Sequence, residues 1–340
     1  MLRVEAQRPV KLDRRALLRA AGAGVAAQLA APGAVQGWWR LPRSGAGGGW
    51  ALVTADLDGF VGVVDIARRR VVRRVATIDG PRSIEARPGA GAVVVGHATE
   101  GAVTLLEGSP LRVRRVLRGF GEPRYAAIAP GGRHAFVSDS AHGELAVVDL
   151  RRGRVVARVD VGAGARHLTL DPRGRTLWIA LGSTAAALVV VDVGRPAAPR
   201  VVRRVAPPFG AHDVAFSPSG QRVWVTGGRT GQLALYHAGA SRPGAIVAAD
   251  AAPQHVTFGT HVAYVASGEG RSLTAHALAD GRVLRRARTP LGSYNVARGA
   301  GAVVTPSLGS GELTVLDPAG RRRWSVHVAD AAHDACLVAR

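Results

Sequence analysis

Residues 210–238 read GAHDVAFSPSGQRVWVTGGRTGQLALYHA. Two short apolar runs flank the turn PSGQ, and a third apolar run follows a second Gly-rich turn. Short apolar runs bounded by Gly, Pro and Ser are typical of β-strands joined by tight turns. The stretch therefore predicts consecutive antiparallel strands, and its first strand is preceded by the polar pair His212-Asp213.

The same pattern recurs along the chain at intervals of 39 to 46 residues. Each unit holds four apolar runs, which in residues 124–165 are YAAIA, HAFVS, ELAVVDL and RVVARVDV. A period near 40 residues with four strands per unit is typical of a β-propeller, in which each unit forms one blade. The units start at Arg82, Arg124, Arg166, His212, Gln254, Tyr294 and His333.

The ends of the repeat region complement each other. Residues 50–78 supply three strands of a unit and lack the first, whereas residues 333–338 supply a first strand only. Joined, they complete one blade and remove two exposed sheet edges. We therefore predict an all-β fold over residues 50–340, a seven-bladed β-propeller of four-stranded antiparallel blades. In this fold the ring is closed by pairing of the N- and C-terminal strands.

The runs SPSGQRVWVTGGRTGQLALYH and LRRGRVVARVDVGAGAR resemble the YVTN-type repeat of seven-bladed propellers, although Ser219 and Gly131 replace the usual turn Asp. The resemblance covers residues 50–340. It implies the propeller fold but no single function. Proteins of this shape include surface-layer repeat proteins, lactonase-like hydrolases, quinoprotein dehydrogenases, copper-site propellers and metal chaperones.

The N-terminal segment carries the marks of an export signal. DRRALLR at residues 13–19 precedes a mildly apolar Ala/Leu/Gly run and resembles the twin-arginine motif. It departs from the motif in having Asp13 where Ser or Thr is usual and Leu17 where Phe is usual. We predict a signal over residues 1–37, a linker over residues 38–49, and export to the periplasm, cell envelope or exterior. A frayed amphipathic helix on a cytoplasmic protein is the alternative.

The formal net charge of +21 invites a nucleic-acid partner. However, Lys11 is the only lysine among 45 basic residues, which indicates a general bias toward arginine, and aromatic residues make up only 5%. Arginine-rich runs such as RVVRRV fall in the predicted outer strands, where charge opposes edge-to-edge association. We therefore do not expect nucleic-acid binding. The sole cysteine, Cys336, excludes disulfides within the chain and cysteine-rich metal sites.

The starts of the first strands should gather at one mouth of the central channel, where propellers usually bind ligands. Neutral imidazoles bind zinc or copper, and three histidines come from consecutive units. A merely polar, hydrated channel mouth is the competing interpretation. The predicted metal ligands are His167, His212 and His255. The predicted ligand-binding residues are Arg82, Arg124, Tyr125, Arg166, Asp213, Tyr294, Asn295, His333 and Asp334.

These features predict an exported, monomeric, non-catalytic binding or scaffold protein. Its partner would be a small ligand, a metal ion or an envelope protein, with no membrane span after signal removal. No cofactor is certain, and a divalent zinc or copper ion is the candidate. An enzyme of lactonase-like or metal-dependent lyase or oxidoreductase type is one alternative. A cell-envelope interaction module that uses only the rim is the other.

Overall fold

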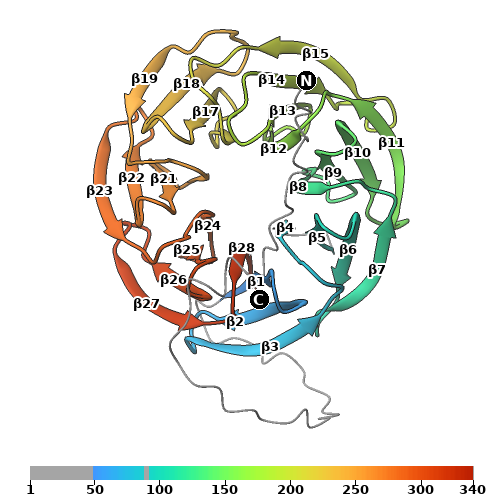
Figure 1. The fold of residues 1–340 in the computed structure, drawn as a ribbon, viewed down its shortest axis with the longest axis vertical. Coiled ribbons are helices and arrows are strands. Elements are labelled where there is room, and N and C mark those ends of the chain that lie inside the picture. The colour runs from blue at the N-terminus through green and yellow to red at the C-terminus, as the bar shows by residue number, and fades with distance from the viewer. Residues whose placement is uncertain (1–48, 88–91, 340) are drawn as a thin grey trace, which may run out of the picture. The chain divides into compact units, whose positions relative to one another are not determined.

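A computed structural model describes residues 49–87 and 92–339. In this part of the chain, 28 strands form seven four-stranded antiparallel sheets arranged as blades around a central axis (Figure 1). The predicted seven-bladed propeller is therefore confirmed. The proposed signal and most of the proposed linker lie outside the described residues. The described residues contain no helix of the length and apolarity needed to cross a membrane.

Every blade has the same strand order from the channel outward. The innermost strands are β28 (Ala332–Ala339), β4 (Ser83–Ala86), β8 (Pro123–Ile128), β12 (Ala165–Leu170), β16 (Val214–Phe216), β20 (Val256–Phe258) and β24 (Ala297–Gly299). The second strands are β1 (Gly49–Ala55), β5 (Val93–His97), β9 (His134–Asp139), β13 (Thr176–Leu181), β17 (Arg222–Gly227), β21 (Val262–Ser267) and β25 (Ala302–Pro306).

The third and outermost strands complete each blade. The third strands are β2 (Phe60–Asp65), β6 (Ala102–Glu107), β10 (Glu144–Asp149), β14 (Leu188–Asp192), β18 (Gln232–His237), β22 (Ser272–Ala277) and β26 (Glu312–Leu316). The outermost strands are β3 (Arg70–Ala76), β7 (Arg112–Arg118), β11 (Arg154–Asp160), β15 (Arg200–Val205), β19 (Ala245–Ala248), β23 (Val283–Arg288) and β27 (Arg322–His327).

The ring closes through one blade built from both ends of the described chain. Its order is β28-β1-β2-β3, and β28 pairs antiparallel with β1, with Cys336 opposite Leu52. This is the predicted closure. It gives β1 a partner on both sides, so the backbone groups of a buried strand are paired.

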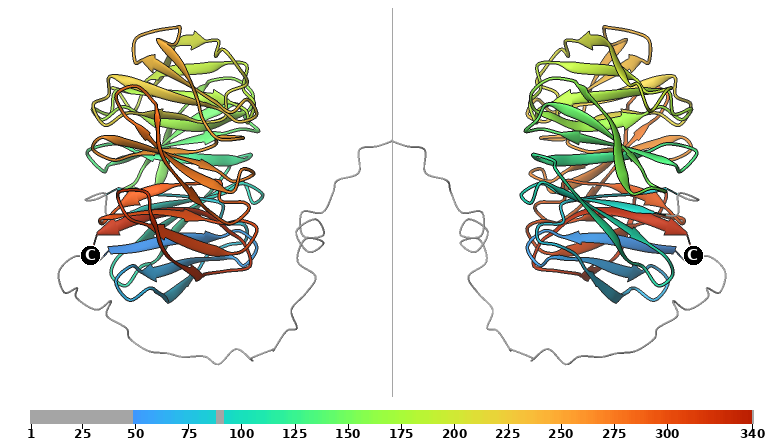
Figure 2. Two further views of the ribbon diagram at one scale, coloured as in Figure 1. Left: turned by 90° about the vertical axis from the view of Figure 1, so that its left-hand side faces the viewer. Right: turned by 90° about the vertical axis from the view of Figure 1, so that its right-hand side faces the viewer.

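The core lies between neighbouring blades, whose sheets stack face to face around the ring (Figure 2). Between the blades of β12–β15 and β16–β19, the ring of Trp178 lies 5.7 Å from that of Tyr236, centroid to centroid, and both side chains are fully buried. Val223 and Phe216 join the same cluster. Large apolar side chains on the central strands therefore hold successive blades together.

Several outer-strand arginines do more than keep the edges charged. On β7, the Nη1 of Arg114 donates to the carbonyl of Leu150 in the next blade at 2.8 Å. On β11, the Nη2 of Arg158 donates to the carbonyl of Gly119 at 2.8 Å. These arginines provide partners for turn carbonyls in adjacent blades, a structural role that the sequence interpretation missed.

Hydroxyl groups on the second strands link the innermost strands of neighbouring blades. Thr226 Oγ1 accepts from the backbone N–H of Asp213 at 2.9 Å and donates to the carbonyl of Gln254 in the next blade at 2.7 Å. Thr54 and Ser138 occupy the corresponding position and make the same pair of bonds in their own blades. A single buried side chain thus fixes the spacing of two strand starts at the channel.

This geometry predicts an unequal effect for two isosteric substitutions. Thr226→Val should destabilise the protein by about 1–3 kcal/mol, because a buried N–H and a buried carbonyl lose their partner. Thr104→Val is the control, since Thr104 is fully buried and its Oγ1 has no hydrogen-bond partner. That variant should match or exceed the wild type in chemical unfolding. Equal unfolding midpoints for both variants would contradict the linking role.

Candidate metal centre

All seven innermost strands, with the residues just before them, line a cavity of about 350 Å³ in the channel, and one lining residue of each forms a ring. The ring residues all occupy the equivalent position near the strand start, which the sequence repeat identified. Because side chains alternate along a strand, the residues two positions further on line the cavity at the next level. The seven equivalent residues are Ser83, Tyr125, His167, Asp213, His255, Asn295 and Asp334.

Three histidines from consecutive blades meet at one side of the channel. His167 lies on β12, His212 lies two residues before β16, and His255 lies one residue before β20. One ring nitrogen from each lies within 4.8 Å of the others. Within the described residues, this is the one group of three or more His, Cys, Asp or Glu side chains placed to share an ion. The structure therefore brings the predicted metal ligands together.

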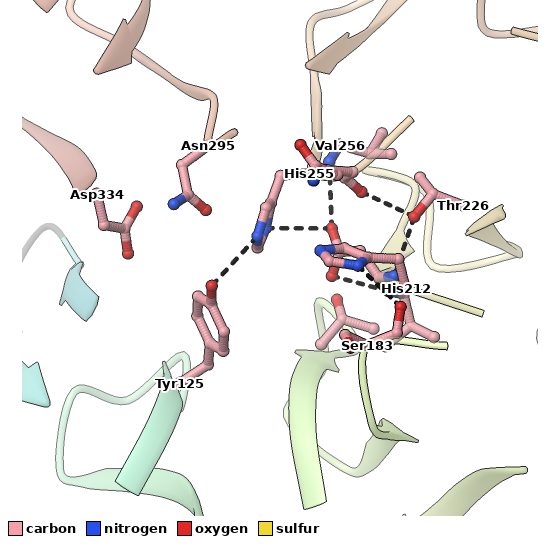
Figure 3. Close-up of polar contacts among 12 residues, drawn as sticks. Tyr125, Ser183, His212, Thr226, His255, Val256, Asn295 and Asp334 are labelled. Atoms are coloured by element: carbon pink, nitrogen blue, oxygen red, sulfur yellow. Dashed lines mark hydrogen bonds and ion pairs between the residues drawn. The ribbon is translucent and has the colours of Figure 1, made fainter. Parts of the chain in front are cut away.

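A neighbouring carbonyl orients His212, and a carboxylate lies near His255. The Nδ1 of His212 lies 3.0 Å from the carbonyl of Ser183, so Nδ1 carries the proton and donates. The Nδ1 of His255 lies 3.5 Å from a carboxylate oxygen of Asp213. Figure 3 shows His255 and His212 side by side, with Tyr125 on the other side of His255. Acceptors at Nδ1 are the usual partners of metal-binding histidines, because they leave Nε2 as the ligand.

His167 provides the test of whether the site fits an ion. Its side chain is 1% exposed, and neither ring nitrogen has a hydrogen-bond partner. Its ring packs between Tyr125 and His212, with centroids 4.5 Å from each. Buried polar atoms without partners are rare in folded proteins because they have lost their hydration. A metal ion would satisfy one of these nitrogens, so the residues present fit such a ligand.

The surroundings keep all three imidazoles neutral. Burial lowers the pKa of His212 to about 4 and the pKa values of His167 and His255 well below the usual 6.5. Positive charge on Arg166 lowers all three further. Metal ions bind the neutral form of imidazole. At neutral pH the site is therefore already in the protonation state that an ion requires.

Asp213 and Asp334 have structural partners at the channel. Asp213 accepts backbone N–H groups from Val214 at 2.8 Å and from Val256 in the next blade at 3.2 Å. Asp334 makes the same pair of bonds to Ala335 and Ile84. Burial raises the pKa of both carboxyl groups to about 7, although the backbone donors oppose this shift. The Asp of each His-Asp pair therefore ties two innermost strands together.

The other predicted ligand-binding residues are more scattered. Arg82 pairs with Asp56 and Arg124 with Glu122, each at 2.6 Å. The buried His333 contacts the carbonyl of Arg82 through Nδ1 at 2.7 Å. Tyr125, Asp213, Asn295 and Asp334 line the cavity, whereas Arg82, Arg124, Arg166, Tyr294 and His333 are not among its lining residues. Ligand binding by these side chains remains a prediction.

Glu85 and Cys336 are among the cavity residues that the sequence interpretation missed. Glu85 and Cys336 each lie two positions beyond a member of the ring, on β4 and β28. Burial, reinforced by Asp334, raises the pKa of Glu85 to about 8. Extending the ring by one strand repeat of two residues would have identified both.

No sequence-family model and no curated protein sequence matches the chain. Its fold resembles a functionally unknown protein from Desulfotomaculum acetoxidans DSM 771, with a TM-score of 0.75 and 12% identity over 85% of this chain and 99% of that one. It also resembles apo AztD from Citrobacter koseri, with a TM-score of 0.67 and 12% identity over 86% of this chain and 98% of that one.

A third similar structure is the dihydro-heme d1 dehydrogenase NirN in complex with DHE. It has a TM-score of 0.62 and 17% identity over 82% of this chain and 63% of the other. Sequence identities this low establish a shared architecture and no shared activity. The comparisons show that the chain is structurally like known β-propellers.

Proposed function

We propose that this protein is an exported, non-catalytic propeller that binds a divalent zinc or copper ion through His167, His212 and His255. The observation that carries the proposal is the convergence of three neutral imidazoles, with one nitrogen from each within 4.8 Å of the others. One of the three, His167, is buried with no hydrogen-bond partner for either nitrogen. Imidazole nitrogen is a good ligand for both metals.

The ligand set leaves room for a further ligand, because structural zinc sites usually have four protein ligands and the histidines supply three. His167 and His255 line the channel cavity of about 350 Å³, whereas His212 is not among its lining residues, so the ion would lie at the edge of this cavity.

The proposal places the protein outside the cytoplasm. Its support is the DRRALLR stretch and the apolar run that follows it in the sequence. A propeller with buried metal ligands is also suited to the twin-arginine route, which carries folded proteins.

The metal site can be tested by calorimetric titration of metal-stripped protein with zinc and with copper. The wild type should bind one ion per chain. His212→Ala removes one direct ligand, so its affinity should fall at least ~100-fold, more than the typical loss on removing a partner of a ligand.

His237→Ala is the matched control, because His237 is an exposed histidine at the far end of β18. It should bind like the wild type. Absence of binding by the wild type beyond weak surface association, or equal binding by His212→Ala, would overturn the metal assignment.

The lowered histidine pKa values predict an unusual pH dependence. Three exposed histidines with pKa near 6.5 would lose about a thousandfold in metal affinity between pH 7.5 and 5.5, because each becomes protonated. Here the folded-state pKa values lie lower, so protons compete only at lower pH. Affinity measured by titration should therefore fall less than about tenfold over that interval, then steeply toward pH 4. A thousandfold loss by pH 5.5 would contradict burial of the site.

Export has its own test. Replacing Arg14 and Arg15 with lysine should retain the precursor in the cytoplasm, because the twin-arginine pathway recognises that pair. Cell fractionation and immunoblotting would measure the distribution. Unchanged export would indicate the general secretory route.

A further inference from the structure

Tyr125 reaches the histidine group from the blade next to that of His167. It lies on β8, three blades away from His255 along the chain, yet its hydroxyl lies 3.3 Å from the Nε2 of His255 (Figure 3). Its ring centroid is 4.5 Å from that of His167 and 5.3 Å from that of His255. Tyr125 therefore contacts both His167 and His255, and it forms a closed group of four side chains with the three histidines.

The spacing of the phenol oxygen and Nε2 matches neighbouring ligand atoms. A hydrogen bond that includes a hydroxyl donor is usually about 2.8 Å long, so 3.3 Å makes this one weak. With metal–ligand bonds of about 2.0 Å, two vertices of a tetrahedral site lie about 3.3 Å apart. The histidine nitrogens, within 4.8 Å of one another, need to close by at most about 1.5 Å, which side-chain rotation can supply.

Other oxygen donors near the triad are less suited to the fourth position. Both carboxylate oxygens of Asp213 already accept a backbone N–H group, and one of them also faces His255. Asp334 is likewise held by two N–H groups, and Figure 3 shows it across the channel from His212. Among the described residues, the hydroxyl of Tyr125 makes one hydrogen-bond contact, the long one to the Nε2 of His255, and metal binding would replace it.

We propose that the phenol oxygen of Tyr125 is the fourth ligand, so that the channel holds a divalent zinc or copper ion through three imidazoles and one phenolate. This inference rests on the proposed function, because it assumes an ion at the three histidines. Copper(II) has the highest intrinsic affinity among divalent first-row ions and is therefore the probe for the test.

The binding step balances as a proton exchange. The O–H bond of Tyr125 breaks, a metal–oxygen bond forms, and the proton passes to water in the channel. Burial disfavours the phenolate, and so do Asp334 and Asp213, whereas the positive charges of Arg166 and Arg82 favour it. The phenolate leaves the metal site with one positive charge fewer to bury.

The test is copper(II) titration of the full exported chain, followed by visible absorption. The wild type should develop a phenolate-to-copper charge-transfer band that saturates at one ion per chain. Tyr125→Phe should keep the histidines, bind copper at least ~10-fold more weakly, and show no such band. Tyr236→Phe is the matched control, because Tyr236 packs against Trp178 between blades and does not line the cavity, and it should retain the band.

A second measurement avoids any dependence on how the variant folds. Resonance Raman spectra of copper-loaded wild type, excited within the band, should show phenolate ring vibrations. Copper binding without the band, or a band that persists in Tyr125→Phe, would overturn the role of Tyr125 and leave the three-histidine site standing. Failure of the wild type to bind either metal would instead overturn the proposed function.

Discussion

The structure depends on how the innermost strands satisfy their unpaired edges. Each innermost strand pairs with one neighbour inside its blade, and its other edge faces the channel. Backbone N–H groups there lie away from bulk water and need partners. Asp213 provides partners for Val214 and Val256, and Asp334 does so for Ala335 and Ile84. The channel must therefore carry polar side chains whatever the protein binds.

This requirement explains why a binding site can arise there. Some polar side chains of the ring form no hydrogen bond to the strand backbone and yet are buried in the channel. His167 is the clearest case. The same burial acts in opposite directions on acids and bases, because it disfavours whichever form is charged. It makes the imidazoles neutral and ready to bind an ion, and it raises the pKa of Asp213 to about 7. Burial therefore leaves the histidines neutral and free to bind an ion, whereas the hydrogen bonds of Asp213 to Val214 and Val256 give it a structural role.

The sequence was sufficient for the fold and only partly sufficient for the site. The repeat period predicted the blades, the missing first strand predicted ring closure, and strand phase predicted that His167 and His255 face the channel. Strand phase could not predict which partner each polar side chain finds, because that depends on the neighbouring loops and blades. Arg82 and Arg124 pair with Asp56 and Glu122 on nearby loops. Whether a side chain reaches across the channel, as that of Tyr125 does, likewise depends on which neighbours leave room.

A seven-bladed ring also limits how an ion can be held. An ion needs ligand atoms about 2 Å away, whereas the starts of seven innermost strands are spread around a whole channel. Equivalent residues from every blade cannot converge on one point, so a site must break the ring symmetry. Here three histidines come from consecutive blades, and His212 joins from one position earlier than His167 and His255. A fourth ligand from a neighbouring blade therefore needs a side chain long enough to reach the group. Tyr125 comes from β8, in the blade next to that of His167, and its hydroxyl lies 3.3 Å from the Nε2 of His255.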